Sequence, residues 1–163
     1  MAAEDIFDTY HSELRTRLIA IHPELSAAAS SNSSGGAIGI HIAEEIAGLP
    51  LATLKTPFAV IHSPSFKRAD FGHNMQEMEV DTEIYYVGSP SERSLIRKKA
   101  AEIANYFDDE ANDLTDDIGQ IVEVSEVSSN RYLPLNREFI EKQMPLLGAA
   151  VVIKCWLHRN QEA

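Results

Sequence analysis

The sequence predicts an α+β fold: a mainly antiparallel sheet of four or five strands, an N-terminal helix and one long helix packed on one face, and an extended β-hairpin arm. Strand-like segments occur in two pairs, and a long segment with helical periodicity lies between the pairs. Because strands and helices do not alternate strictly, an antiparallel sheet is favoured over a doubly wound parallel one. The 163 residues are 44% hydrophobic, which suits a single domain over residues 1–163 with one core.

The N-terminal part of the chain predicts a helix followed by a flexible tract. Residues 4–21 are amphipathic, and their apolar stripe recurs at helical spacing: Phe7, Tyr10, Leu14, Leu18 and Ile21. Pro23 ends this helix. The Ser/Gly-rich segment 26–39, SAAASSNSSGGAIG, is too polar to pack by itself, so we expect it to be flexible. HIAEEIAG, residues 41–48, predicts a short helix.

The first two predicted strands, residues 57–64 and 78–88, are separated by a long excursion. A hairpin closes with about two residues, whereas residues 63–76 intervene here. This segment combines aromatic and basic side chains: Phe66, Lys67, Arg68 and Phe71. Exposed aromatic residues beside basic ones are typical of a contact tip. A mobile loop is the alternative, and the sequence does not decide between the two.

A capped turn is predicted to start the long helix, at about residues 90–108. Ser89 precedes Glu92 by three residues and Pro90 occupies the first helical position, which is the pattern of a capping box. This motif engages the backbone N–H groups that a phosphate would need, and no glycine-rich phosphate-binding pattern is present. We therefore interpret the junction as a turn. The predicted buried stripe of the helix is Ile96, Ala100, Ile103 and Phe107.

The last two predicted strands are residues 118–127 and 148–158. The first alternates between apolar and polar residues, whereas the second is apolar on both faces, with Trp156 on one of them. A strand that is buried on both faces is either central in its sheet or covered by another chain. We therefore treat Trp156 as a candidate contact residue.

No candidate for catalysis or for cofactor binding stands out, so the chain is predicted not to be an enzyme and to carry no cofactor. Cys155 alternates with Ile153 and Leu157, where a small buried hydrophobe is expected. The six histidines show no metal-binding spacing. The carboxylate row of Glu79, Asp81 and Glu83 is interpreted as a solvated strand face.

Net charge also restricts the partners. At −11, the surface repels the phosphate backbone, so a broad nucleic-acid interface is disfavoured. No apolar run reaches the length of about 18 residues that a membrane helix requires, so no membrane partner is expected. The acidic N-terminal segment is unlike a secretory signal, which favours assembly inside a cell.

The long helix carries its charges in an unusual order. Basic residues occupy its first half, namely Arg93, Arg97, Lys98 and Lys99, and acidic residues close it, namely Asp108, Asp109 and Glu110. The helix dipole favours the reverse order, by about 0.3–1 kcal/mol per charge. This order suits head-to-tail pairing between copies around a ring. The alternative is an ordinary surface helix, since exposed charges contribute little to stability.

These elements together resemble a known family. The segments PFAVIHSP, SPSERSLIRKKAAEIANYF and LGAAVVIKCWLHR, which cover roughly residues 57–158, resemble the tail terminator and tail-completion proteins of long-tailed bacteriophages. That resemblance implies an α+β subunit that assembles into a ring, commonly a hexamer, which caps the tail tube and joins it to the head connector.

The resemblance therefore implies a non-enzymatic virion protein, assembled in the host cytoplasm. Its expected partners are its own copies and neighbouring tail-tube and connector proteins, with DNA at most passing through the lumen. The candidate interface residues are Phe66, Lys67, Arg68, Phe71, Arg97, Lys98, Lys99, Asp108, Asp109 and Trp156. Two alternatives stay open: a small ligand-binding or hydrolytic α+β domain, and a cellular adaptor that binds one protein.

Overall fold

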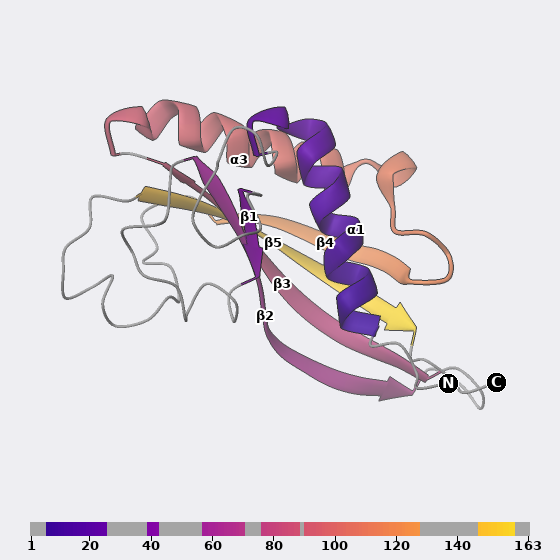
Figure 1. The fold of residues 1–163 in the computed structure, drawn as a ribbon. Helices are drawn as coiled ribbons and strands as arrows, with labels where there is room; N and C mark the ends of the chain where they lie inside the picture. The colour runs from indigo at the N-terminus through magenta and orange to yellow at the C-terminus, as the bar shows by residue number, and fades with distance from the viewer. Residues whose placement is uncertain are drawn as a thin grey trace.

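A five-stranded sheet with helices on one face organises the chain (Figure 1). The computed structural model describes residues 6–25, 39–42, 57–70, 76–88, 90–127 and 147–158. In chain order the elements are α1 (Ile6–Ile21), η1 (Pro23–Leu25), β1 (Ile40–Ile42), β2 (Phe58–Asp70), β3 (Gln76–Gly88), η4 (Pro90–Glu92), α3 (Arg93–Asp108), η5 (Glu110–Asn112), β4 (Gly119–Val127) and β5 (Leu147–His158). The strand order is β1-β2-β3-β5-β4. Only the short β1 runs parallel to its neighbour, so the predicted α+β class with a mainly antiparallel sheet is confirmed.

The two long helices, α1 and α3, lie on the same side of the sheet (Figure 1). The predicted stripe of α1 is buried at Tyr10, Leu14 and Leu18, each 0% exposed. The predicted stripe of α3 is also buried, at Ile96, Ala100, Ile103 and Phe107. These side chains join those of β2, β3 and β5 in one hydrophobic cluster, because the helical and strand periodicities both direct apolar residues to this layer.

The last strand, β5, is an interior strand of the sheet, which is one of the two positions that its apolar faces allowed. It pairs with β3 on one side and with β4 on the other. Val151, Ile153 and Cys155 are fully buried on the helix side, and Ala150 is buried on the other face. Trp156 is half-buried on that second face.

The predicted loop at residues 63–76 is wrong for most of its length. β2 continues to Asp70 and stays paired with β3 there, Arg68 opposite Met78, after a register shift between His62 and Ser65. The physical reason is that β3 is itself paired with β5 as far as Glu77 opposite His158, so it offers β2 a long template. This half of the hairpin belongs to the sheet, and the structure does not confirm a separate arm.

The start of the long helix also differs from the prediction. A 3₁₀ turn occupies Pro90–Glu92 and α3 begins at Arg93, with Glu92 in the N-cap position and without a side-chain capping hydrogen bond. The predicted capping box between Ser89 and Glu92 stays a prediction, because Ser89 lies outside the described residues.

The structure tests only part of the predictions for residues 26–48, namely the flexible tract and the short helix. The predicted helix at 41–48 is wrong at its start, because His41 and Ile42 belong to β1, which the parallel pairing with β2 stabilises. Residues 43–48 and nearly all of the Ser/Gly-rich segment, residues 26–38, lie outside the described part of the chain. Among the described helices, none is both long and apolar enough to cross a membrane.

Candidate functional site

The charge order predicted for the long helix is present on the surface of α3. Arg93, Arg97 and Lys98 are exposed at its start, and Asp108 is exposed at its end. Within the described part of the chain, none of these four residues forms an ion pair. Lys98 and Asp108 are about 15 Å apart along the helix, at about 1.5 Å per residue, so they cannot pair with each other. That separation also exceeds the Debye length of about 8–10 Å.

Lys99 differs from its basic neighbours because it is used inside the subunit. Its ammonium lies 2.9 Å from Glu24 Oε1, and both side chains are partly buried. The phenol of Tyr86 donates to the same carboxylate oxygen at 2.9 Å. The structure therefore places Lys99 in the packing of η1 against α3 and β3.

His22 completes this cluster, and nothing in the sequence pattern singled it out. The residue is 0% exposed. Its Nε2 lies 3.0 Å from the carbonyl oxygen of Lys99, and since a carbonyl can only accept, Nε2 donates. Nδ1 lies 3.8 Å from Glu24 Oε1 and 3.7 Å from Glu102 Oε2. His22 and Lys99 are 77 positions apart, so sequence spacing could not reveal the cluster.

The contacts in this cluster shift the pKa values of two of its members. Burial works to raise the pKa of Glu24, but the hydrogen bond from Lys99 and the other contacts outweigh it and hold that pKa below its ordinary value. Burial raises the pKa of Tyr86, and its hydrogen bond to Glu24 raises it further. The cluster thus favours an ionised Glu24 beside a neutral Tyr86.

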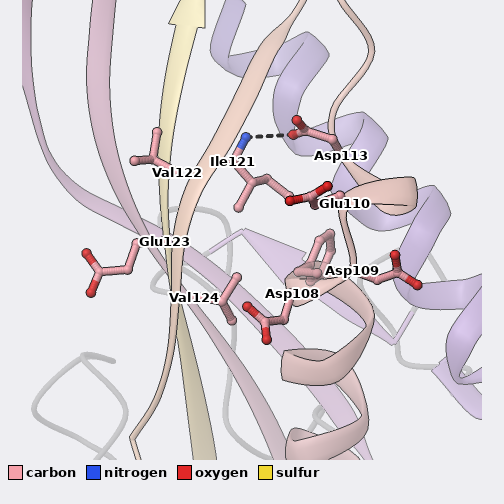
Figure 2. Close-up of a pocket in the computed structure, with 9 residues that line it drawn as sticks. Asp108, Asp109, Glu110, Asp113, Ile121, Val122, Glu123 and Val124 are labelled. Atoms are coloured by element: carbon pink, nitrogen blue, oxygen red, sulfur yellow. Dashed lines mark hydrogen bonds between the residues drawn. The ribbon is translucent and has the colours of Figure 1, made fainter.

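An acidic hollow of about 230 Å³ lies at the end of α3, between that helix, η5 and β4 (Figure 2). Its lining combines carboxylates with apolar side chains: Phe107, Asp108, Asp109, Glu110, Asp113, Ile121, Val122, Glu123 and Val124. Figure 2 shows Asp108, Glu110 and Asp113 on the α3 side of β4, with Val122 and Glu123 on the other side of that strand. Both sides of β4 are therefore bordered by acidic groups.

Specific contacts hold the acidic segment in place. Asp113 Oδ1 accepts from the backbone N–H of Ile121 at 2.7 Å, and Asp109 accepts from the N–H of Ala111 at 3.0 Å (the first bond is drawn in Figure 2). From α1, the guanidinium of Arg17 donates to the carbonyl oxygens of Asn112 and Asp113, the latter at 2.7 Å. The run of acids is thus an ordered wall of the hollow.

The remaining candidate interface residues lie elsewhere on the molecule. Phe66, Lys67 and Arg68 belong to β2, which β3 and β5 separate from β4. Phe71 lies outside the described residues. Trp156 is on β5, opposite Glu79 in the register. The structure therefore brings together the acidic candidates Asp108 and Asp109, and does not bring the aromatic-basic segment to them.

The carboxylate row on β3 is paired rather than simply solvated. Glu79, Asp81 and Glu83 are half-buried. Glu79 Oε1 lies 3.4 Å from the Lys154 ammonium, and Glu83 accepts from the phenol of Tyr85. The hydrogen bond with Glu79, together with its charge, raises the pKa of Lys154. The Glu79–Lys154 contact therefore joins β3 to β5, whereas the Glu83–Tyr85 contact lies within β3.

Cys155 is a buried structural residue, as the sequence predicted. It is 0% exposed, and burial raises the pKa of its thiol to about 12. Its Sγ lies 3.4 Å from the phenol oxygen of Tyr10. A thiol with so high a pKa holds almost no thiolate near neutral pH, which makes it poorly suited to nucleophilic chemistry.

A chain of polar contacts that the sequence did not reveal links α1 to the sheet. Tyr10 donates to Thr82 Oγ1 at 2.8 Å, Thr82 and Ser63 hydroxyls are 3.0 Å apart, and Ser63 Oγ lies 3.0 Å from His11 Nε2. The Ser63–His11 contact has the length of a nucleophile–base pair. Because the Ser63 hydroxyl is shared with Thr82, we assign the contact to the packing of α1 on β2 and β3.

In the ranges that the structure describes, no group of three His, Cys, Asp or Glu side chains is placed to hold a metal ion. No protein-family model matches the chain, and a search of curated proteins finds no significant relative.

Proposed function

We propose that this chain is a non-enzymatic structural protein of a bacteriophage virion, in which its copies form a ring at the head–tail junction or at the tail end. A hexamer is the ring size that the sequence resemblance implies. Tail-tube and connector proteins are the neighbours, and DNA at most passes through the lumen. Assembly takes place in the host cytoplasm. The phage setting rests on the resemblance of residues 57–158, and self-assembly rests on the charges of α3.

The observation that carries the proposal is the separation of opposite charges along α3. Exposed Arg97 and Lys98 lie near one end and exposed Asp108 lies at the other, and none of the three forms an ion pair with another described residue. Such charges can pair between subunits, where they set orientation and association rate. A contact of the basic end of one copy with the acidic end of the next repeats head to tail, and it closes into a ring when the rotation allows.

The net charge of −11 fits a ring through which DNA passes. An acidic lumen repels phosphate groups, so the duplex would cross it without adhering.

The first experiment measures the oligomeric state of the purified protein by light scattering over a wide concentration range, and images the particles by electron microscopy. We expect a closed ring of defined copy number. A protein that stays monomeric at high concentration and forms no ring with tail-tube protein present would contradict the proposal.

The second experiment tests the charge argument. Lys98→Glu should raise the dissociation constant between subunits at least about tenfold, which corresponds to about 1.4 kcal/mol. Adding Asp108→Lys should partly restore assembly, since the contact is then reversed in sign. The matched control combines Lys98→Glu with Asp8→Lys on the exposed surface of α1, which gives the same net charge without the complementary site. Equal recovery in both double variants would show that only net charge matters.

A further inference from the structure

A second set of buried side chains lies on the face of the sheet opposite α1 and α3, which we call the far face. Its members alternate along β2 and β3 with residues of the cluster beneath the helices, so they point away from that cluster. They are fully buried or, for Tyr85, 2% exposed: Phe58, Val60, Tyr85 and Val87. A sheet face without cover would leave such side chains in contact with water. Since both long helices lie on the other side (Figure 1), a different part of the chain covers the far face.

The far face is covered over β2 and β3 but not over β4. The burial extends to Ala150 of β5. On β4, Glu123 and Ser125 lie on the same face by their pairing with β5, and both are exposed. The cover therefore lies toward the β1 side of the sheet. Residues 43–56 join β1 to β2 on that side, whereas residues 128–146 follow the edge strand β4.

The pairing of β1 with β2 independently requires the chain to cross one face of the sheet. The two strands are parallel, with Ile42 beside Ile61. Because β2 begins at Phe58, the chain that leaves Ile42 must return along the sheet before it enters β2. Parallel strands need a crossover of about a dozen residues or more, and residues 43–56 have that length.

The handedness of crossovers decides which face residues 43–56 take. β3 and β4 are parallel to each other, because both are antiparallel to β5, and α3 lies in the crossover between them. The step from β1 to β2 has the same direction across the sheet as the step from β3 to β4, but β1 and β2 run opposite to β3. Crossovers between parallel strands are almost always right-handed. Two right-handed crossovers in this arrangement lie on opposite faces, so the β1–β2 crossover belongs on the far face.

We infer that residues 43–56 dock on the far face, over β2 and β3, as the crossover that joins β1 to β2. The segment has the apolar side chains that this role needs, namely Ile46, Leu49, Leu51 and Leu54. The occupant of this surface is then the chain itself, and neither a second copy nor another protein. The inference goes beyond the proposed function and does not depend on it. It removes this part of the sheet from the surfaces through which copies of the chain can assemble.

Photo-cross-linking tests the contact. Tyr85 is replaced by the photoreactive aromatic residue benzoylphenylalanine, and mass spectrometry identifies the linked peptide after irradiation. We expect a link within one chain to residues 43–56. The matched control carries the same photoreactive residue at Ser125, which is exposed on the far face of β4, and should not link to this segment. A link from position 85 to residues 128–146, a link between two copies, or no link would overturn the inference.

Trypsin tests the same contact on the unmodified protein, so the result does not depend on how a variant folds. Lys55 is the one trypsin site in residues 43–56. In the native protein, cleavage after Lys55 should be at least about tenfold slower than in a synthetic peptide of residues 43–62, because the docked segment must first open. Equal rates would show that the segment is not docked, whether or not the protein forms a ring.

Discussion

The phenol of Tyr10 donates a hydrogen bond of 2.8 Å to Thr82 Oγ1, which ties α1 to β3 across 72 positions of sequence. Both residues are 0% exposed. Buried polar groups need such partners, because an unsatisfied hydroxyl in the core costs about 1–3 kcal/mol. The Tyr10–Thr82 pair therefore fixes how the N-terminal helix sits on the sheet.

Replacing Tyr10 by Phe should lower the free energy of unfolding by about 0.5–1.5 kcal/mol, the usual net contribution of one hydrogen bond. Thr82 keeps its contact with Ser63, which limits the loss. Urea denaturation measures the change. The control is Tyr106→Phe, whose half-buried ring packs against Phe107 without a hydroxyl contact in the described structure. Equal losses in the two variants would contradict a specific role for the Tyr10 hydroxyl.

Cys155 should react with a thiol reagent only when the protein unfolds. Burial first, and nearby carboxylates to a smaller extent, raise the thiol pKa to about 12. Labelling followed by mass spectrometry should show no modification in buffer near neutral pH and complete modification in denaturant. Rapid labelling of the native protein would show that the thiol is accessible.

The same thiol predicts a loss of stability in alkaline solution. The folded pKa lies above the ordinary value of 9.0, so the contribution of the thiol is fully present below pH 9.0 and is lost as the pH rises toward about 12. Denaturation curves at several alkaline pH values should fall less steeply for Cys155→Ala than for the natural protein. Parallel curves for the two proteins would exclude this contribution.

The ion pair between Lys99 and Glu24 predicts a loss of stability at acid pH. The pKa of Glu24 is held below its ordinary value of 4.5. Its contribution to the free energy of unfolding is therefore present above pH 4.5 and disappears as the pH falls further. Lys99→Met should remove this dependence and cost at most about 1 kcal/mol near neutral pH. Arg93→Met is the control, because Arg93 is exposed and forms no ion pair among the described residues. A larger effect of Arg93→Met on stability would argue against the pairing.

Gly119 should not tolerate a side chain. Its φ is +154°, and a Cβ atom there would lie 2.0 Å from the carbonyl oxygen of Trp156. Strained backbone alone costs about 1–3 kcal/mol, and the clash with backbone adds to it. Gly88→Ala is the control, since its Cβ would meet side-chain atoms and no backbone, namely two Ile96 carbons at 3.1 and 3.2 Å and Glu92 Oε2 at 3.5 Å. Thermal unfolding should therefore show a much larger loss of stability for Gly119→Ala than for Gly88→Ala.

The fold class could be predicted because its signals are local. The period of α1 placed Tyr10 and Leu14 in the core, and the two apolar faces of β5 allowed the interior position that it takes in the sheet. The length of β2 could not be predicted, since the polar residues 63–70 do not alternate and become a strand only because β3 offers a partner. Tertiary pairing overrode the local pattern there.

The candidate site was predictable only in part. Exposed Lys98 and Asp108 followed directly from the helical pattern. The role of Lys99 was not visible, because Glu24 comes from a distant segment. The acidic hollow was missed as well. Its wall depends on Arg17, whose contact with Asn112 spans 95 positions, and no pattern within the acidic run indicates it.

The position of β5 has a consequence for biosynthesis. β5, the last described strand in the sequence, connects β4 to the rest of the sheet, because β3 and β4 both pair with it and not with each other. While the ribosome is still adding residues before Leu147, β4 has no described strand to pair with, although α3 can already pack against it. The polypeptide must therefore complete its sheet after translation has passed this point. A premature stop upstream of Leu147 would leave β4 without its strand partner and the sheet incomplete.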